Sequence, residues 1–132
     1  MEQMQVLTEL SKLTENLLYF SESESPYTIT VWTDVQPHQL AEQIAASQPT
    51  NAQLKPVDFH LFFEQLVNRV DPSDSVLIEN AKRTSRLKDF LQTNLSQLQV
   101  FRAEGSSAIP IFIAGFLPNQ SCVLLQTKAI ET

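Results

Sequence analysis

The chain has 132 residues, of which 42% are hydrophobic and 18% charged, so it is long enough for one globular domain and too apolar for a disordered segment. Lysine and arginine total 9 against 15 aspartates and glutamates, and the resulting net charge of −6 disfavours direct binding to nucleic acid phosphates. The same charge either steers the chain toward a basic partner or serves solubility alone, and composition does not decide between the two.

The start of the chain and its one cysteine indicate a cytoplasmic protein. No apolar run approaches the roughly 18 residues of a membrane span, and the start at Met1 lacks the basic residues of a secretion signal. Cys122 is alone, so no intrachain disulfide can form, which suits a reducing compartment. Its apolar neighbours indicate a small buried strand residue in preference to a reactive thiol.

Residues 3–18 are predicted to form an amphipathic helix, because their apolar residues recur at spacings of three and four. These are Val6, Leu7, Leu10, Leu13, Leu17 and Leu18. Residues 21–26 should be a loop, because Pro26 lacks an amide hydrogen and restricts Ser25. Residues 27–33 alternate as a strand, with Tyr27, Ile29 and Val31 on one face and Thr28, Thr30 and Trp32 on the other.

Helical elements are expected in the middle of the chain. A short helix should follow Pro37 and bury Leu40, Ile44 and Ala45, before a polar loop over residues 47–53 and a short extended segment over residues 54–57. Asp58 is a suitable N-cap for a helix that runs to about Arg69. That helix should bury Phe59, Phe62, Phe63, Leu66 and Val67.

A turn over residues 71–75 should separate this helix from a longer one over residues 76–95, which carries Leu77, Ala81, Leu87, Phe90 and Leu91. The last third of the chain changes to strand periodicity, with strands predicted at residues 100–103, 109–114 and 122–130. Their short connections require antiparallel neighbours. We therefore expect a single domain over residues 1–132, of the α+β class, with helices packed on a mainly antiparallel sheet of about four strands.

Catalytic and cofactor motifs are not found in the sequence. Two glycines are too few for a phosphate-binding glycine loop, and no cysteine pair offers a zinc site. His60 and Glu64 flank the apolar face of their helix and are predicted to be a solvated pair. No catalytic residue and no cofactor are predicted, and an enzyme is the least favoured class of protein.

Two acidic segments are candidates for contact with another protein. Ser21-Glu22-Ser23-Glu24 places two carboxylates on a short segment before a strand, where they are either presented to a basic pocket or simply solvated. The ending Glu131-Thr132 follows a predicted strand and offers hard oxygen atoms that suit Mg²⁺ or Ca²⁺, although one residue cannot build a closed metal site. A frayed tail is the alternative.

At these two places the sequence resembles the nuclease A inhibitor family. The resemblance rests on residues 17–26 with the strand after them and on residues 126–132, and more loosely on Lys55-Pro56-Val57-Asp58, Phe62-Phe63 and Glu79-Asn80-Ala81. It implies an α/β/α sandwich and a protein that inhibits a metal-dependent, sugar-non-specific endonuclease acting on DNA and RNA.

The resemblance also implies a set of residues that bind the partner. Glu22 matches the glutamate that enters the nuclease active site, and Thr132 matches the threonine that completes the coordination of the nuclease's Mg²⁺. Glu24 and Glu131 lie beside them. Asp74 matches the aspartate of an Asp-Trp pair that touches the nuclease, whereas Ser75 stands where the family has tryptophan.

The expected function is therefore nuclease inhibition by a protein that is a monomer alone and a heterodimer with its target, without a cofactor, a membrane or direct nucleic acid contact. Because buried aromatic residues are common interface anchors, Ser75 keeps a second hypothesis open. In that alternative, the chain is a protein-binding module of the same fold whose partner is not a nuclease.

Overall fold

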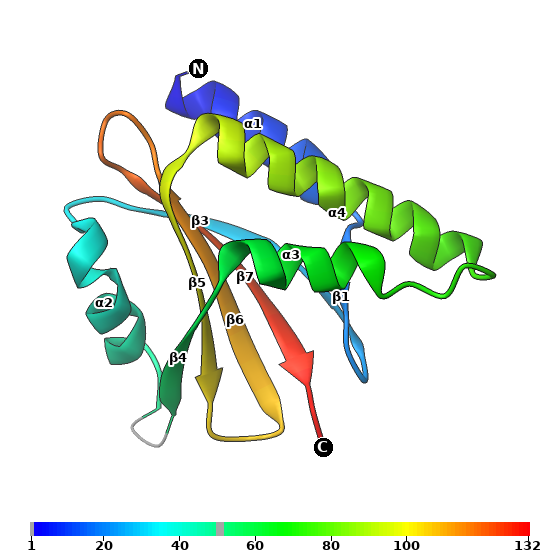
Figure 1. The fold of residues 1–132 in the computed structure, drawn as a ribbon. Helices are drawn as coiled ribbons and strands as arrows, with labels where there is room; N and C mark the ends of the chain where they lie inside the picture. Colours follow the sequence, from blue (N-terminus) through cyan, green and yellow to red (C-terminus); the bar gives the residue numbers. More distant parts are fainter. Residues whose placement is uncertain (1, 50–51) are drawn as a thin grey trace.

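The computed structural model describes residues 2–49 and 52–132, and Figure 1 shows its elements in chain order. The helices are α1 (Gln3–Thr14), α2 (Leu40–Ala46), α3 (Phe59–Asn68) and α4 (Ser75–Asn94), with a 3-10 turn, η1 (Pro37–Gln39), before α2. The strands are β1 (Leu18–Phe20), β2 (Glu24–Pro26), β3 (Thr28–Trp32), β4 (Gln53–Val57), β5 (Ser96–Glu104), β6 (Ala108–Phe116) and β7 (Cys122–Ile130).

The main sheet has five strands in the order β3-β7-β6-β5-β4, and all neighbours are antiparallel. The predicted α+β class and antiparallel sheet are confirmed. The sheet has one strand more than expected, because the short segment before Asp58 pairs along β5 as the edge strand β4. β1 and β2 form a separate two-stranded hairpin.

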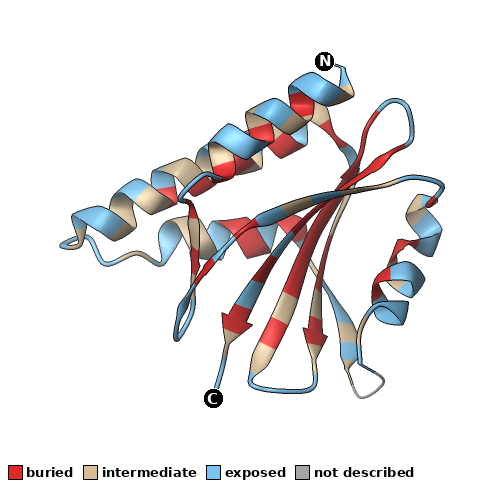
Figure 2. Cartoon of the chain, turned by 180° about the vertical axis from the view of Figure 1, so that it is seen from behind, coloured by how far each residue is buried: buried red, intermediate tan, exposed pale blue. Residues whose placement is uncertain are grey.

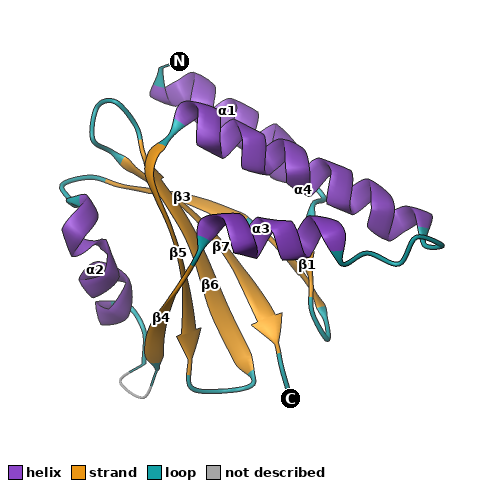
Figure 3. Ribbon diagram, viewed as in Figure 1, coloured by secondary structure: helices purple, strands orange, loops and turns teal. Residues whose placement is uncertain are grey.

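Helices cover both faces of the sheet (Figures 1 and 3), as the predicted sandwich requires. α1, α3 and α4 cover one face, and the larger apolar core beneath them includes Leu10, Phe63, Leu87 and Ile111. α2 covers the other face, where Leu40 and Ile44 pack with strand residues such as Phe112. Buried residues therefore concentrate on the central strands and on the inner faces of the helices (Figure 2).

The N-terminal segment differs from the prediction at two places. α1 ends at Thr14 instead of Leu18, because Asn16 adopts a positive φ of 60° and reverses the chain. Leu17 is nevertheless fully buried, which is why its spacing continued the helical pattern. Residues 24–26, predicted as loop, form β2, which pairs with β1 and buries Ser25.

The side chain of Asn80 in α4 fixes the hairpin to the helical layer. Its Oδ1 accepts the Leu18 N–H at 3.0 Å, and its Nδ2 donates to the Leu18 carbonyl at 2.9 Å. Both backbone groups of Leu18 are thereby satisfied. The hairpin is consequently held between α4 and the sheet.

The predicted helix caps are confirmed. The Asp58 carboxylate accepts the Leu61 N–H at 2.9 Å at the start of α3, and Pro37 begins the turn that leads into α2. Ala45 is exposed instead of buried, because its side chain lies one residue beyond the Leu40 and Ile44 stripe. The predicted loop at residues 47–53 lies partly outside the described residues, and its last residue, Gln53, opens β4.

The C-terminal strands follow the prediction and extend it. β5 is longer than expected at both ends, with a bulge between Ser96 and Gln99. Cys122 is fully buried in β7, and burial raises the pKa of its thiol to about 11, which agrees with an unreactive core residue. Within the described residues, no helix combines the length and apolar character needed to cross a membrane.

Candidate functional site

The tip of the β1–β2 hairpin is fastened to the end of β7. The turn itself closes through the Ser21 N–H, which donates to the Ser23 carbonyl at 2.8 Å. The Ser21 hydroxyl accepts the Ile130 N–H at 2.9 Å, and the Glu22 N–H donates to the Ile130 carbonyl at 3.2 Å. These two bonds hold the hairpin tip against Ile130, so Glu22 lies beside the last residues of the sequence.

Glu22 and Thr132 are joined directly, although 110 residues separate them. The Glu22 carboxylate accepts the Thr132 N–H at 2.5 Å and the Thr132 hydroxyl at 2.9 Å. Both residues are exposed, so their oxygen atoms lie at the surface and are accessible to a partner. The structure thus brings together the two residues that the resemblance singled out separately.

Glu131 is held from the other side of the same strand end. Its N–H donates to the Ser107 carbonyl at 2.9 Å, in the turn between β5 and β6. Its carboxylate pairs with Arg102 of β5, with Nη2 and Oε2 at 2.6 Å. The segment after β7 is therefore anchored by the hairpin on one side and by β5 on the other.

Arg102 belongs to a row of alternating charges that runs from β4 to the end of β7. Lys55 Nζ lies 2.9 Å from Glu104 Oε1, and Glu104 Oε2 lies 3.2 Å from Arg102 Nε. Partial burial opposes the charge of Arg102, but hydrogen bonds and attraction to Glu131 and Glu104 outweigh this effect and raise its pKa. A hydrogen bond from Lys55 is the main cause that lowers the pKa of Glu104.

The remaining predicted carboxylate of the hairpin is placed differently. Glu24 is the first residue of β2, lies opposite Phe20 and is exposed. No side-chain hydrogen bond or ion pair of Glu24 is found within residues 2–49 and 52–132. Glu22 and Glu24 therefore offer a matched comparison, because one carboxylate is fixed by the end of the chain and the other is solvated.

Asp74 and Ser75 lie at the N-terminus of α4. The Asp74 carboxylate accepts the N–H groups of Val76 at 3.0 Å and Leu77 at 3.1 Å, so Asp74 is the N-cap of this helix. Ser75 is the first helical residue instead of the last residue of a turn, and it is exposed beside the exposed Val76. Neither residue forms a hydrogen bond with Glu22, Glu131 or Thr132 in the described part of the chain.

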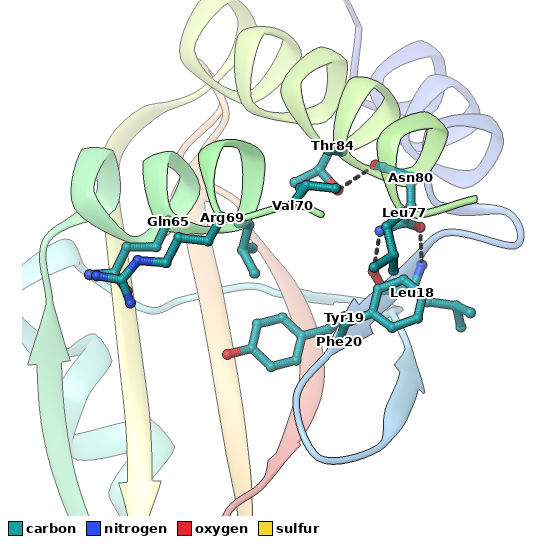
Figure 4. Close-up of a pocket in the computed structure, with 11 residues that line it drawn as sticks. Leu18, Tyr19, Phe20, Gln65, Arg69, Val70, Leu77, Asn80 and Thr84 are labelled. Atoms are coloured by element: carbon teal, nitrogen blue, oxygen red, sulfur yellow. Dashed lines mark hydrogen bonds between the residues drawn. The ribbon is translucent and has the colours of Figure 1, made fainter. Parts of the chain in front are cut away.

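A cavity of about 260 Å³ lies between β1, α3 and α4. It is lined by β1 residues that lead to the Glu22 turn, by the end of α3 and by α4 (Figure 4). Thr84 and Asn80 are joined across one helical turn at 2.9 Å, and the Tyr19 ring points away from them toward the sheet. Glu22, Thr132, Asp74 and Ser75 themselves do not line this cavity.

The oxygen atoms of Glu22 and Thr132 are hard donors of the kind that Mg²⁺ prefers. Among residues 2–49 and 52–132, no group of three or more histidine, cysteine, aspartate or glutamate residues lies close enough to hold a metal. These oxygen atoms could therefore add to the coordination of an ion whose other ligands come from elsewhere.

Sequence reasoning missed Arg102 and the role of Ser21. Arg102 lies 29 residues before Glu131 in the sequence, and only the sheet order brings the pair together. Ser21 was part of the acidic segment, but its hydroxyl bond to Ile130 depends on the same tertiary arrangement.

Comparison with known proteins gives one clear result. A family model described as "Nuclease A inhibitor-like protein" matches residues 4–132, which is nearly the whole chain and includes every candidate site residue. No curated protein matches the sequence. With this match over the full fold, the chain belongs to the nuclease A inhibitor-like protein family.

Proposed function

We propose that this protein inhibits a metal-dependent, sugar-non-specific endonuclease by occupying its active site. Family membership supports a nuclease as the target. The observation that carries the proposal is the direct contact between Glu22 and Thr132, because it places a carboxylate and a hydroxyl together at one exposed point.

The chemistry of a nuclease active site suits this pair. Such a site is basic because it holds phosphates, and its Mg²⁺ keeps exchangeable water positions. In the proposed complex the Glu22 carboxylate occupies the place of a phosphate, and a Thr132 oxygen completes the coordination of the nuclease's Mg²⁺. The chain itself carries out no reaction and contributes no cofactor.

The other predicted residues complete the contact area. Glu131 remains paired with Arg102 beside the metal contact, and Glu24 adds charge at its edge. Asp74 and Ser75 form a second contact at the start of α4. The net charge of −6 favours rapid approach to a basic target. The protein acts as a monomer in the cytoplasm and forms a heterodimer with the nuclease.

Ser75 favours a second candidate function. An exposed serine at the first position of α4 offers no aromatic anchor to the usual target. A binding module of the same fold, with a partner that is not a nuclease, would need no such anchor.

The two candidates are separated by a direct assay. The purified protein is titrated against a Mg²⁺-dependent sugar-non-specific endonuclease, and cleavage of both DNA and RNA is measured. Equal, stoichiometric loss of both activities is expected, because one active site serves both substrates. No inhibition of such nucleases, with capture of a protein other than a nuclease from the native host, would support the alternative.

A further inference from the structure

The row of charges on β4 and β5 ends at Glu131, the residue next to Thr132. Arg102 is the central member, because its Nε faces Glu104 at 3.2 Å and its Nη2 faces Glu131 at 2.6 Å. β6 lies between β5 and β7 in the sheet, so the Arg102 side chain reaches across one strand to make the second contact. A planar guanidinium is suited to hold two carboxylates at once.

The environment of Arg102 strengthens this contact. Only 22% of its side chain is exposed, so the pair with Glu131 is less screened by water than an ordinary surface ion pair. Tyr19 of the hairpin and Arg102 line the same cavity of about 280 Å³. β1, the first strand of the hairpin that carries Glu22, therefore lies close to Arg102.

We propose that Arg102 is a positioning residue for the inhibitory group. Its bond to the Glu131 carboxylate holds the side chain one residue before Thr132, adding to the bond between the Glu131 N–H and the Ser107 carbonyl, while Glu22 holds Thr132 itself. The terminal residue is thus fixed from both sides before it meets a partner. This inference rests on the proposed function for its inhibitory consequence, but the ordering of Thr132 is a property of the free protein.

The first readout needs no nuclease. The backbone order parameter of the Thr132 amide is measured by ¹⁵N relaxation in the wild type, Arg102→Met, Glu131→Gln and Arg86→Met. Arg86 is exposed on α4 and forms no ion pair among the described residues, so its variant removes the same charge without touching the row. We expect Arg102→Met and Glu131→Gln to lower the value below about 0.6, the range of flexible backbone, and Arg86→Met to match the wild type.

The second readout distinguishes positioning from a general structural role. Arg102→Met should weaken inhibition about fivefold to tenfold in the full chain, the size of a well-placed, partly buried ion pair. In a protein that lacks Thr132, the same Arg102→Met substitution should hardly change inhibition. A merely structural residue would weaken both proteins equally. The thermal midpoint of each variant checks that the fold is intact, and Glu131→Gln repeats the test at a position outside the sheet.

Three results decide the matter. Unchanged order at Thr132 in both Arg102→Met and Glu131→Gln would overturn the proposal, and so would equal weakening with and without Thr132. Loss of order with selective loss of inhibition would support it. If the wild type inhibits no nuclease, the proposed function fails, whereas the order parameter still decides whether Arg102 positions the terminal residue.

Discussion

Two regions of this protein are candidates for contact with the proposed nuclease target, and they are built in opposite ways. The first consists of Glu22, Glu131 and Thr132, whose contacts come from residues far apart in the chain. The second consists of Asp74 and Ser75, and the Asp74 carboxylate accepts only N–H groups of the first turn of α4 within the described residues. The first is a product of the tertiary fold, and the second is a local helix start that any capped helix would offer.

This difference indicates where sequence change is tolerated. Glu22 and Thr132 hold each other, so a change at either one disturbs both. Ser75 is exposed and supports no other residue by a side-chain bond within the described part of the chain, so substitution there leaves the fold intact. The terminal group should therefore be tested by removing contacts, and the start of α4 by adding one.

The largest effect is expected from the terminal residue. Deleting Thr132, or adding residues after it, should weaken inhibition at least about 100-fold, because Mg²⁺ demands near-ideal geometry from each oxygen ligand. The thermal midpoint should hardly move, since an exposed residue buries little area. A tag added before α1 is the control and should leave inhibition unchanged, because α1 begins far from Thr132 in the fold (Figure 1).

Dependence on the metal sharpens this test. Binding of the wild type should weaken when Mg²⁺ is removed, whereas binding of the deletion variant should weaken much less. Equal sensitivity to Mg²⁺ in both proteins would show that Thr132 does not approach the ion. Full inhibition by a chain extended after Thr132 would lead to the same conclusion.

The next effect is expected at Glu22. Glu22→Gln should weaken inhibition roughly 30-fold, because it removes a charge aimed at a basic pocket and one of the two acceptors of Thr132. Glu24→Gln is the matched control, because it removes the same charge two residues away, where the side chain has no hydrogen bond or ion pair among the described residues. We expect less than about a threefold change there. Equal losses from the two variants, measured as inhibition constants, would indicate bulk charge instead of a specific contact.

A gain is expected at the start of α4. Ser75→Trp should tighten binding to a nuclease A-type enzyme about tenfold, because it adds an aromatic anchor next to the exposed Val76. Ser75→Ala is the control for loss of the hydroxyl and should have little effect. Titration calorimetry or inhibition constants measure the difference. An unchanged affinity for Ser75→Trp would favour the binding module with another partner.

The smallest effect concerns stability at the same helix start. Asp74→Ala removes the acceptor of two backbone N–H groups and should lower the free energy of unfolding by about 1 kcal/mol. Asp74→Asn keeps the capping oxygen and should retain most of the stability. Urea denaturation distinguishes these variants, and equal stabilities of all three proteins would show that the Asp74 cap does not stabilise the fold.

Much of the fold could be predicted because local signals agree with the tertiary structure. Asp58 caps α3 as its position before Phe59 suggested, and the strand limits of β7 match its apolar run. The predicted end of α1 was wrong because Leu17 is buried at a helical spacing although the backbone there is no longer helical. The hairpin partner of β1 was missed, because Glu24 and Pro26 carry no strand signal and owe their pairing to long-range packing.

The candidate site could be predicted only in part. Glu22 and Thr132 were found through resemblance to a family, and nothing in residue spacing links positions so far apart. Their contact requires Asn16 to turn the chain, β7 to end beside the hairpin, and Ser21 to bond Ile130. The role of Arg102 could be inferred only from the strand order, which places β5 near the end of β7.

In the proposed complex, Thr132 and Glu22 reach the metal centre of a nuclease, and the start of α4 lies farther from it. The most direct measurement uses a complex of ¹⁵N-labelled protein and a nuclease loaded with paramagnetic Mn²⁺ in place of Mg²⁺. We predict that the amide signals of Thr132 and Glu22 broaden first and most strongly, and that those of Asp74 and Ser75 broaden less. A sharp Thr132 signal in a saturated complex would contradict this arrangement.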